Sequence, residues 1–413
     1  MQDKKGSRAH KESDPKVDTG TNGRRVVGIR ELLDLIVHAL DTKQQCKLMG
    51  VSKYFFYSAG PVVWRRVPRL DIIMSLVKNV KVKGEKSRAD DKWQFIITLP
   101  WNPDFSRYDL YAPWVQELEL YCECYVEIAN FDKWPSFFNG RVLLPNLRQL
   151  TASVDVPVDD IVLIKILHAF VCPSLTELRT IMPNQGLSED LCLRVASFYV
   201  PALLQKIEVT CPQIEVLEFY PDGISGFDQL FGAERYAPTS QCKRILSSFS
   251  SLRSFNSTTY ILKPEILGIL GGLPCLESLG IRSTLTEPSV LDRQLSMPET
   301  WFPALKDIRL YQVSPDYVKA LWSQPAVAKK LTSALLQINF LHPRHPGTSP
   351  LYAENWVGPF LEALPELSPQ LQDVSLHIGY LDDMLEVPRN KWDDFKLGYD
   401  LGDIFYRYKL GLA

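Results

Sequence analysis

The chain has no long apolar run and almost no net charge. No stretch of 18 consecutive apolar residues occurs in its 413 residues, so we expect no transmembrane helix. The formal net charge of -2 at pH 7 gives no reason to expect a nucleic-acid or membrane partner. The first residues, MQDKKGSRAHKESDPK, lack the apolar core of a secretory signal. We therefore expect a protein of the cytosol or nucleus, or both, whose eight cysteines are free thiols.

The chain also lacks the short motifs of common catalytic sites. Neither G-x-x-x-x-G-K-[ST] nor G-x-S-x-G occurs, and no G-x-G-x-x-G opens a helix. His342 and His345 lie in a proline-rich stretch without a third ligand nearby, which favours a solvated loop over a metal site. Cys122 and Cys124 are spaced like two small residues on one face of a strand. We predict a protein without catalytic activity, cofactor or metal, and an enzyme of unknown class stays a minor alternative.

Length and local composition indicate several parts. A chain of 413 residues exceeds the usual size of a single core, so it is multidomain or a repeat array. Residues 1–25 are charged and polar, and we expect a disordered tail there. We expect a helical block at 26–68. The segment Leu70–Val80 is amphipathic, and a charged loop follows it, so 69–92 is predicted as a linker helix and loop. A strand is expected from Trp93 onward.

The helical block carries more apolar surface than it can bury by itself. Apolar residues recur at helical spacing in its first part, and Asp41 with Thr42 offers an N-cap for a second helix. An aromatic cluster around Phe55 comes next, Gly60-Pro61 is expected to end it, and Trp64 closes the block. About forty residues of this composition need a partner surface. This surface is either another protein or the remainder of the chain, of which the block would then be an ordinary helical cap.

The block contains Ile29, Glu31-Leu32-Leu33, Ile36 and Leu40, then Val51-Ser52-Lys53-Tyr54-Phe55, and finally Trp64. On these residues it resembles an F-box in the form common in fungal F-box proteins. Arg30 stands where that family usually has proline, and Ser52-Lys53 stands where Cys-Arg is usual. The resemblance implies that the helices dock in a groove of a Skp-type adaptor, which connects to a cullin scaffold. The residues expected to contact the adaptor are Ile29, Leu32, Leu33, Ile36, Leu40, Val51, Lys53, Phe55 and Trp64.

A repeat with the form L-x-x-L-x-L, usually preceded by proline, recurs nine times after the block. The first copy begins at Val115 and the last at Leu371, 256 residues over eight intervals, a mean spacing of 32. The first apolar residues of the copies are Val115, Leu147, Leu175, Ile214, Leu252, Leu276, Leu305, Leu335 and Leu371. Each copy predicts a turn and a short strand, with proline at the strand entry, where no ladder N–H is needed.

Helical stretches separate the copies, for example around Ile164, around Ile266 and over 315–331. The fold class predicted is therefore α/β: a leucine-rich-repeat solenoid over 93–413, with a curved parallel sheet and helices on its convex side. The irregular spacing resembles the arrays attached to fungal F-boxes. An aromatic segment near the C-terminus, Trp392–Leu410, is expected to cap the last repeat. A doubly wound α/β enzyme is the alternative, but no Gly-rich phosphate loop follows a strand.

The residues between the apolar strand positions are expected to face the open concave side and bind a protein substrate. They are Glu117, Glu119, Tyr121, Glu177, Arg179, Glu218, Tyr220, Arg282, Asp307, Arg309, Tyr311 and His377. Together with the resemblance, this predicts a substrate-receptor subunit of an SCF-type ubiquitin ligase. The alternative is a non-catalytic leucine-rich-repeat scaffold with a degenerate F-box, for which Arg30 is the support.

Overall fold

The structure is a computed structural model that describes residues 29–86, 93–120, 125–138, 140–152, 160–179, 194–196, 200–222, 240–283, 296–339, 351–379 and 404–409. The chain divides between Arg65 and Arg66 into two compact units, here named the helical unit and the sheet unit. The predicted boundary, at residue 68, is three residues further on. The expected tail at 1–25 and the residues Cys122, Cys124, His342 and His345 lie outside the described residues.

The helical unit consists of α2 (Arg30–Ala39), α3 (Thr42–Met49) and α4 (Lys53–Val63). Asp41 begins α3 with a capping box: its carboxylate accepts from the Gln44 N–H at 2.8 Å, and Gln44 Oε1 accepts from the Asp41 N–H at 3.3 Å. Ser52 caps α4 by accepting from the Phe55 N–H at 3.3 Å. Asp41 and Ser52 thus set where α3 and α4 begin, because their side chains accept from backbone N–H groups in the first turn of each helix.

The expected break at Gly60-Pro61 is wrong. Helix α4 continues through Pro61 to Val63, and the Trp64 N–H donates to the Gly60 carbonyl at 2.9 Å. Proline in this last turn removes a single N–H donor, so the cost is smaller than in the middle of a long helix.

The core of the helical unit is small. Leu33, Val37 and Ala59 are fully buried, and Leu48, Met49, Phe55 and Val62 pack against them. Gln45 joins two helices, because its Nε2 donates to the carbonyls of Val37 at 2.9 Å and Leu40 at 3.0 Å. These carbonyls belong to the C-terminal end of α2, where helices leave acceptors unsatisfied.

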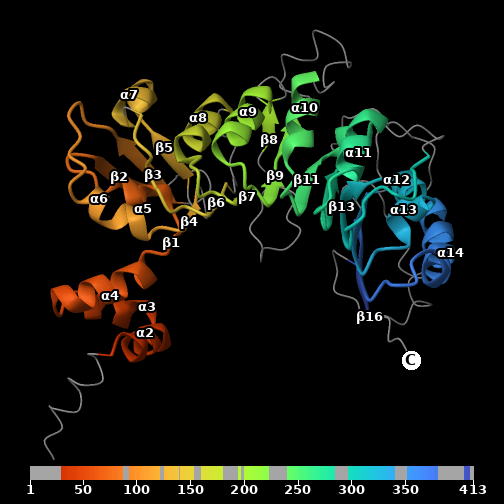
Figure 1. The fold of residues 1–413 in the computed structure, drawn as a ribbon, viewed down its shortest axis with the longest axis horizontal. Helices are drawn as coiled ribbons and strands as arrows, with labels where there is room; N and C mark the ends of the chain where they lie inside the picture. The colour runs from red at the N-terminus through yellow and green to blue at the C-terminus, as the bar shows by residue number, and fades with distance from the viewer. Residues whose placement is uncertain are drawn as a thin grey trace, which may run out of the picture. The chain divides into compact units, whose positions relative to one another are not determined.

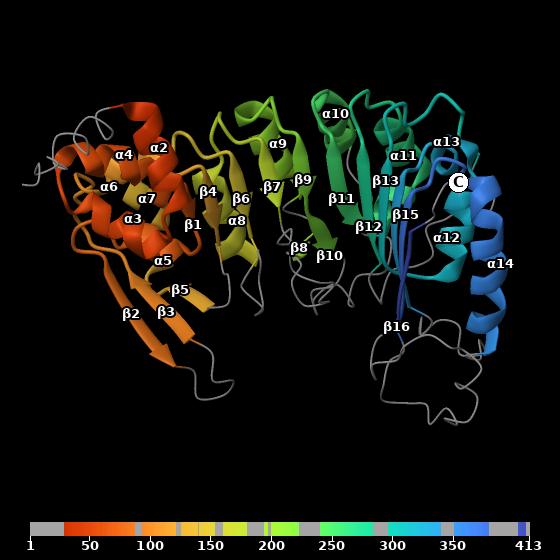
Figure 2. The ribbon, with the colours of Figure 1, turned by 90° about the horizontal axis from the view of Figure 1, so that it is seen from below.

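The sheet unit is built on an 11-stranded sheet in which ten parallel strands follow chain order. The strands are β1 (Arg66–Val67), β4 (Glu117–Glu119), β6 (Gln149–Thr151), β7 (Glu177–Arg179), β9 (Val216–Glu218), β11 (Ser254–Thr258), β12 (Ser278–Arg282), β13 (Asp307–Val313), β14 (Ser333–Asn339), β15 (Asp373–Gly379) and β16 (Ile404–Lys409). Figure 2 shows them side by side. The last strand, β16, pairs antiparallel with β15 and covers its edge. The other residues of the expected C-terminal cap, 392–403 and 410, lie outside the described residues.

Helices precede most strands and lie along one face of the sheet (Figure 1). Those between strands are α8 (Asp160–Phe170), α9 (Val200–Thr210), α10 (Ser240–Ser248), α11 (Pro264–Gly271), α12 (Pro315–Trp322), α13 (Pro325–Ala328) and α14 (Leu351–Leu367). The helices predicted near Ile164, near Ile266 and over 315–331 are confirmed, the last one divided before Pro325. The α/β class is confirmed as a large parallel sheet covered by helices.

Equivalent apolar residues lie side by side across the sheet. Leu118 pairs with Leu150, Leu150 with Leu178, and Leu178 with Leu217, and all four are fully buried. All nine predicted repeats contain a strand. The eighth has a different register, because Ala334 pairs with Ile308 and Val374. The first apolar residue of that copy is therefore the fully buried Leu331, four residues before the expected Leu335.

The turn before each strand is also repeated. The N–H of Leu175 donates to the Cys172 carbonyl at 3.0 Å, and that of Ile214 donates to the Cys211 carbonyl at 3.1 Å. Both cysteines are buried at these corners. Cys211 Sγ also donates to the Cys172 carbonyl at 3.2 Å, which connects one turn to the next.

The predicted linker at 69–92 is part of the sheet unit. Helix α5 (Leu70–Met74) is shorter than expected, and Leu70 and Ile73 are fully buried. Strand β2 (Lys81–Lys86) replaces the expected charged loop and pairs antiparallel with β3 (Trp93–Thr98). Its lysines suit the exposed edge of a sheet, where charge discourages pairing with another chain.

The predicted strand at Trp93 therefore forms, but in a separate sheet of β2, β3 and β5 (Tyr125–Ile128). The remaining elements are α6 (Tyr108–Tyr111), α7 (Trp134–Phe138), three short 3₁₀ helices (Ala112–Trp114, Phe131–Lys133 and Thr259–Leu262), and a pair of parallel strands, β8 (Arg194–Ala196) and β10 (Tyr220–Asp222). Within the described part of the chain, no helix combines the length and the apolar character needed to cross a membrane.

Candidate functional site

Helix α2 is apolar over a wider arc than its own core can cover. Successive residues of a helix are rotated by about 100°, so Leu33 and Val37 form one stripe and Ile29, Leu32, Leu35 and Ile36 form the adjoining one. The first stripe is fully buried, whereas the four residues of the second are between 38% and 68% exposed. The described residues of the helical unit therefore leave the second stripe largely uncovered.

The remainder of the helical unit also carries exposed apolar residues. Val51, in the turn between α3 and α4, is 65% exposed, and Tyr54 and Tyr57 on α4 are also exposed. The Tyr57 ring lies edge-on to the Phe56 ring, with centroids 5.3 Å apart. We name Ile29, Leu32, Leu35, Ile36, Val51, Tyr54 and Tyr57 the apolar face of the helical unit.

Most predicted adaptor contacts are accessible, and one is not. Ile29, Leu32, Ile36, Val51 and Lys53 are exposed, and Leu40, Phe55 and Trp64 are half-buried. Leu33 is a correction: it is fully buried in the core, so it holds the three helices together and cannot touch a partner. Leu35 and Tyr57 are not among the predicted contacts, although the helical rotation from Leu32 and Ile36 places Leu35 beside them.

The second candidate surface is the polar face of the sheet. It lies opposite the apolar rungs, the rows of buried apolar residues that pair across neighbouring strands. The parallel register brings charged and amide side chains of neighbouring strands together. Arg179 Nε donates to Glu177 Oε2 at 2.7 Å, and Arg179 Nη1 lies 3.9 Å from Glu218 Oε1. Asn256 Nδ2 also donates to Glu218 Oε1. Glu218 is thus a buried carboxylate held by one cation and one amide from its two neighbouring strands.

Gly280 leaves the space that Asn256 occupies. The two residues are partners in adjacent strands. A Cβ at position 280 would lie 2.0 Å from Asn256 Oδ1 and 2.6 Å from its Cγ, far below any allowed contact. The glycine is therefore required by the neighbouring side chain.

Arg282 lies between two tyrosine rings. Its guanidinium carbon is 5.6 Å from the centroid of Tyr220 and 5.4 Å from that of Tyr311, within the range of cation–π attraction. Burial raises the pKa of Tyr311, the nearby carboxylates of Glu218 and Asp307 raise it further, and the Arg309 and Arg282 cations oppose them. The phenol therefore stays neutral at physiological pH.

Further ion pairs lie along this face. Arg66 Nε donates to Glu119 Oε1 at 2.7 Å between β1 and β4, at the first edge of the sheet. On β13, Asp307 Oδ2 accepts from Arg309 Nε at 2.8 Å and from Ser278 Oγ of β12 at 2.7 Å. Opposite charges therefore alternate along the face, which suits recognition of a polar protein surface.

The predicted substrate contacts divide into two groups. Glu119, Glu218, Tyr220, Arg282 and Tyr311 are buried, which corrects the expectation that they face open solvent. The cause is their mutual pairing across strands. Glu117, Glu177, Arg179 and Asp307 are partly buried, and Arg309 is exposed. Tyr121 lies outside the described residues, and for His377 the structure gives its place in β15, opposite Phe405.

The described residues contain no cluster of three or more His, Cys, Asp or Glu side chains that could hold a metal ion. No protein-family model matches the chain, and no curated protein matches its sequence.

Proposed function

We propose that the chain is the substrate-receptor subunit of an SCF-type ubiquitin ligase, with the helical unit as its F-box. The observation that carries this proposal is the apolar face of the helical unit. Seven large apolar side chains are exposed on about 35 residues, Ile29 to Val63, while the core beneath them holds three fully buried residues. A surface of this kind indicates a binding site for another protein.

Docking on a Skp-type adaptor would cover this face. The exposed stripe of α2 has the spacing of residues that insert into a groove of a partner. Burying a side chain such as Leu32 or Ile36 completely contributes about 1.5–3 kcal/mol, less for the part already covered. Leu32 and Ile36 are each 38% exposed, so covering the rest of both contributes about 1–2 kcal/mol, a factor of about 7 to 45 in affinity.

The sheet unit would hold the protein substrate. The in-register apolar rungs, the repeated turns and the helix between strands support a leucine-rich-repeat solenoid with the polar face on its concave side. The predicted contacts on that face whose charges stay at least partly accessible are Glu117, Glu177, Arg179, Asp307 and Arg309. The receptor itself performs no bond chemistry; it raises the effective concentration of substrate lysines near the ubiquitin-charged enzyme.

The test is capture of the host's Skp-type adaptor by the full-length chain. The double variant Leu32→Glu/Ile36→Glu places two carboxylates in the exposed stripe and leaves the core of Leu33 and Val37 unchanged. The lost apolar burial and the cost of burying two carboxylates add up, so we expect at least a 30-fold loss of adaptor affinity by calorimetry, with an unchanged circular dichroism spectrum. The matched control is Val209→Glu, because Val209 is an apolar residue that is 76% exposed on helix α9 of the sheet unit.

Equal adaptor binding by the double variant and the wild type would refute the role of this face. Failure of a folded wild-type chain to bind any adaptor would support the second candidate, a scaffold with a degenerate F-box. Arg30, in place of the usual proline, is the sequence feature that favours it. A scaffold would also leave its bound partner without ubiquitin-dependent turnover.

A further inference from the structure

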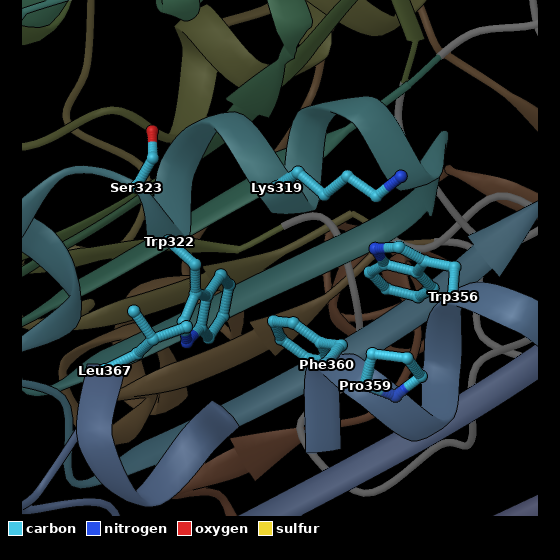
Figure 3. A pocket seen from close by; sticks show the side chains of 7 residues that line it. All are labelled: Lys319, Trp322, Ser323, Trp356, Pro359, Phe360 and Leu367. Carbon is cyan, nitrogen blue, oxygen red and sulfur yellow. The ribbon is translucent and has the colours of Figure 1, made fainter. Parts of the chain in front are cut away.

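Helices α12 and α14 line an open hollow on the helix-covered side of the sheet unit. Its volume is about 430 Å³. Its walls include Lys319 and Trp322 from α12, and Trp356, Pro359, Phe360 and Leu367 from α14 (Figure 3). Sites for small molecules have volumes of about 300–1,000 Å³ and mostly apolar walls with a few polar groups. The hollow has both properties.

Three aromatic rings form the walls, and they are fixed by contacts with one another. The rings of Trp322 and Phe360 meet edge to face with centroids 5.5 Å apart. Those of Trp356 and Phe360 stack at 4.9 Å with an angle of 16°. All three residues are buried or nearly so. A ligand ring would therefore meet a wall that is already formed, at little cost in side-chain ordering.

One cation lies at the rim. Lys319 is exposed, and its ammonium lies 5.8 Å from the centroid of the Trp356 ring. Figure 3 shows the Lys319 nitrogen near the Trp356 indole. Within the described part of the chain it forms no ion pair. Deeper in the wall, the indole N–H of Trp322 has no hydrogen-bond acceptor among the described residues. The third polar group is the Ser323 hydroxyl, which donates to the Ala320 carbonyl at 2.7 Å. The cation and the indole donor both favour an acceptor in the ligand.

We propose that this hollow binds a small carboxylic acid with an aromatic body. The ring would stack against Trp356 and Phe360, and the carboxylate would pair with the Lys319 ammonium. An aromatic cage could instead attract a cationic ligand, but Lys319 already lies over the Trp356 ring and would repel one. This site is separate from the apolar face of the helical unit, and the proposal does not depend on adaptor binding.

The test uses three probes of nearly the same shape and different charge: 3-phenylpropionate, 3-phenylpropionamide and 3-phenylpropylamine. Each is titrated into the full-length chain by calorimetry and checked by saturation-transfer NMR. We expect saturable binding of the acid, at least fivefold weaker binding of the amide, and no measurable binding of the amine.

Three variants assign the preference to Lys319. Lys319→Gln should reduce acid binding to the level of the amide, and Lys319→Arg should restore it to within about threefold of the wild type. Lys329→Gln is the matched control, because it removes one exposed lysine near Glu299 and should change nothing. A fourth variant, Phe360→Leu, removes one ring of the wall and should weaken the acid and the amide equally, with folding checked by circular dichroism.

Four results would overturn the proposal. The first two are no saturable binding of the acid at millimolar concentration, and equal affinity for the acid and the amide. The third is a preference for the acid that persists in Lys319→Gln. The fourth is self-association of the chain that Phe360→Leu abolishes. The last result would mean that a second copy of the chain covers the hollow.

Discussion

The substitution Gly280→Ala tests how the polar face of the sheet is held together. The added Cβ would lie 2.0 Å from Asn256 Oδ1, so the asparagine has to leave its position. A side chain forced about 30° off its rotamer costs about 0.5–1.5 kcal/mol. Losing the hydrogen bond from Asn256 to the buried Glu218 carboxylate costs about 1.5–3 kcal/mol. We therefore expect the variant to be destabilised by about 2–4.5 kcal/mol.

The assay is urea unfolding of the full chain, followed by far-UV circular dichroism. Asn256→Ala removes the same hydrogen bond and the two clashing atoms, so a methyl group at position 280 would meet only the Cβ of residue 256, at 3.1 Å, which a shift of a few tenths of an ångström relieves. The double variant should therefore be about as stable as Asn256→Ala alone, which is a large departure from additivity. Gly272→Ala is the control, because its added Cβ would be at ordinary contact distance from the Ile269 carbonyl, 3.4 Å. Additive effects, or a Gly280→Ala variant within about 0.5 kcal/mol of the wild type, would refute the packing described for these two residues.

Two further predictions concern burial. Leu33→Ala should destabilise the helical unit by about 2–4 kcal/mol, whereas Leu32→Ala should cost less than about 1 kcal/mol, because only Leu33 lies in the core. Hydrogen exchange of the α2 and α4 amides distinguishes the two variants. Equal protection in both variants would contradict the burial assigned to Leu33 and Leu32. Burial raises the pKa of the Cys211 thiol to about 12. At pH 8 this thiol is therefore protonated, and a disulfide reagent should label the exposed Cys46 at least a hundredfold faster than Cys211, as peptide mass spectrometry would show.

The repeat made most of the sheet unit predictable from the sequence. Proline, a turn and alternating apolar residues recur with enough regularity to place nine strands and several helices. The eighth copy shows the limit of this pattern. Leu335 and Ile338 have the expected spacing, but Ala334 occupies the buried rung between Ile308 and Val374. A residue as small as alanine gives a weak signal of burial, so the pattern favoured the wrong frame.

Burial of the polar strand residues could not be predicted in the same way. Glu119 is buried because it pairs with Arg66, which is 53 residues earlier in the chain. Glu218 and Asn256 are 38 residues apart and meet through the strand register. Alternation along one strand shows which face a side chain is on, but the neighbouring strands decide whether it reaches solvent. The same holds for Leu33 and Leu32, which are adjacent in sequence and have opposite environments.

The uniform register of the parallel strands has a consequence for how such a chain can change in length during evolution. Val216 lies opposite Ser254, and Ser254 lies opposite Ser278, so residues 254–277 form one complete unit of strand, helix and turn. Loss of these 24 residues would bring β9 against β12 with every rung still matched, Leu217 beside Leu279. The two strands would pair without a shift in register. The cost would fall on Glu218, which would face Gly280 in place of Asn256, so the polar pairs, rather than the apolar rungs, restrict which units can be lost.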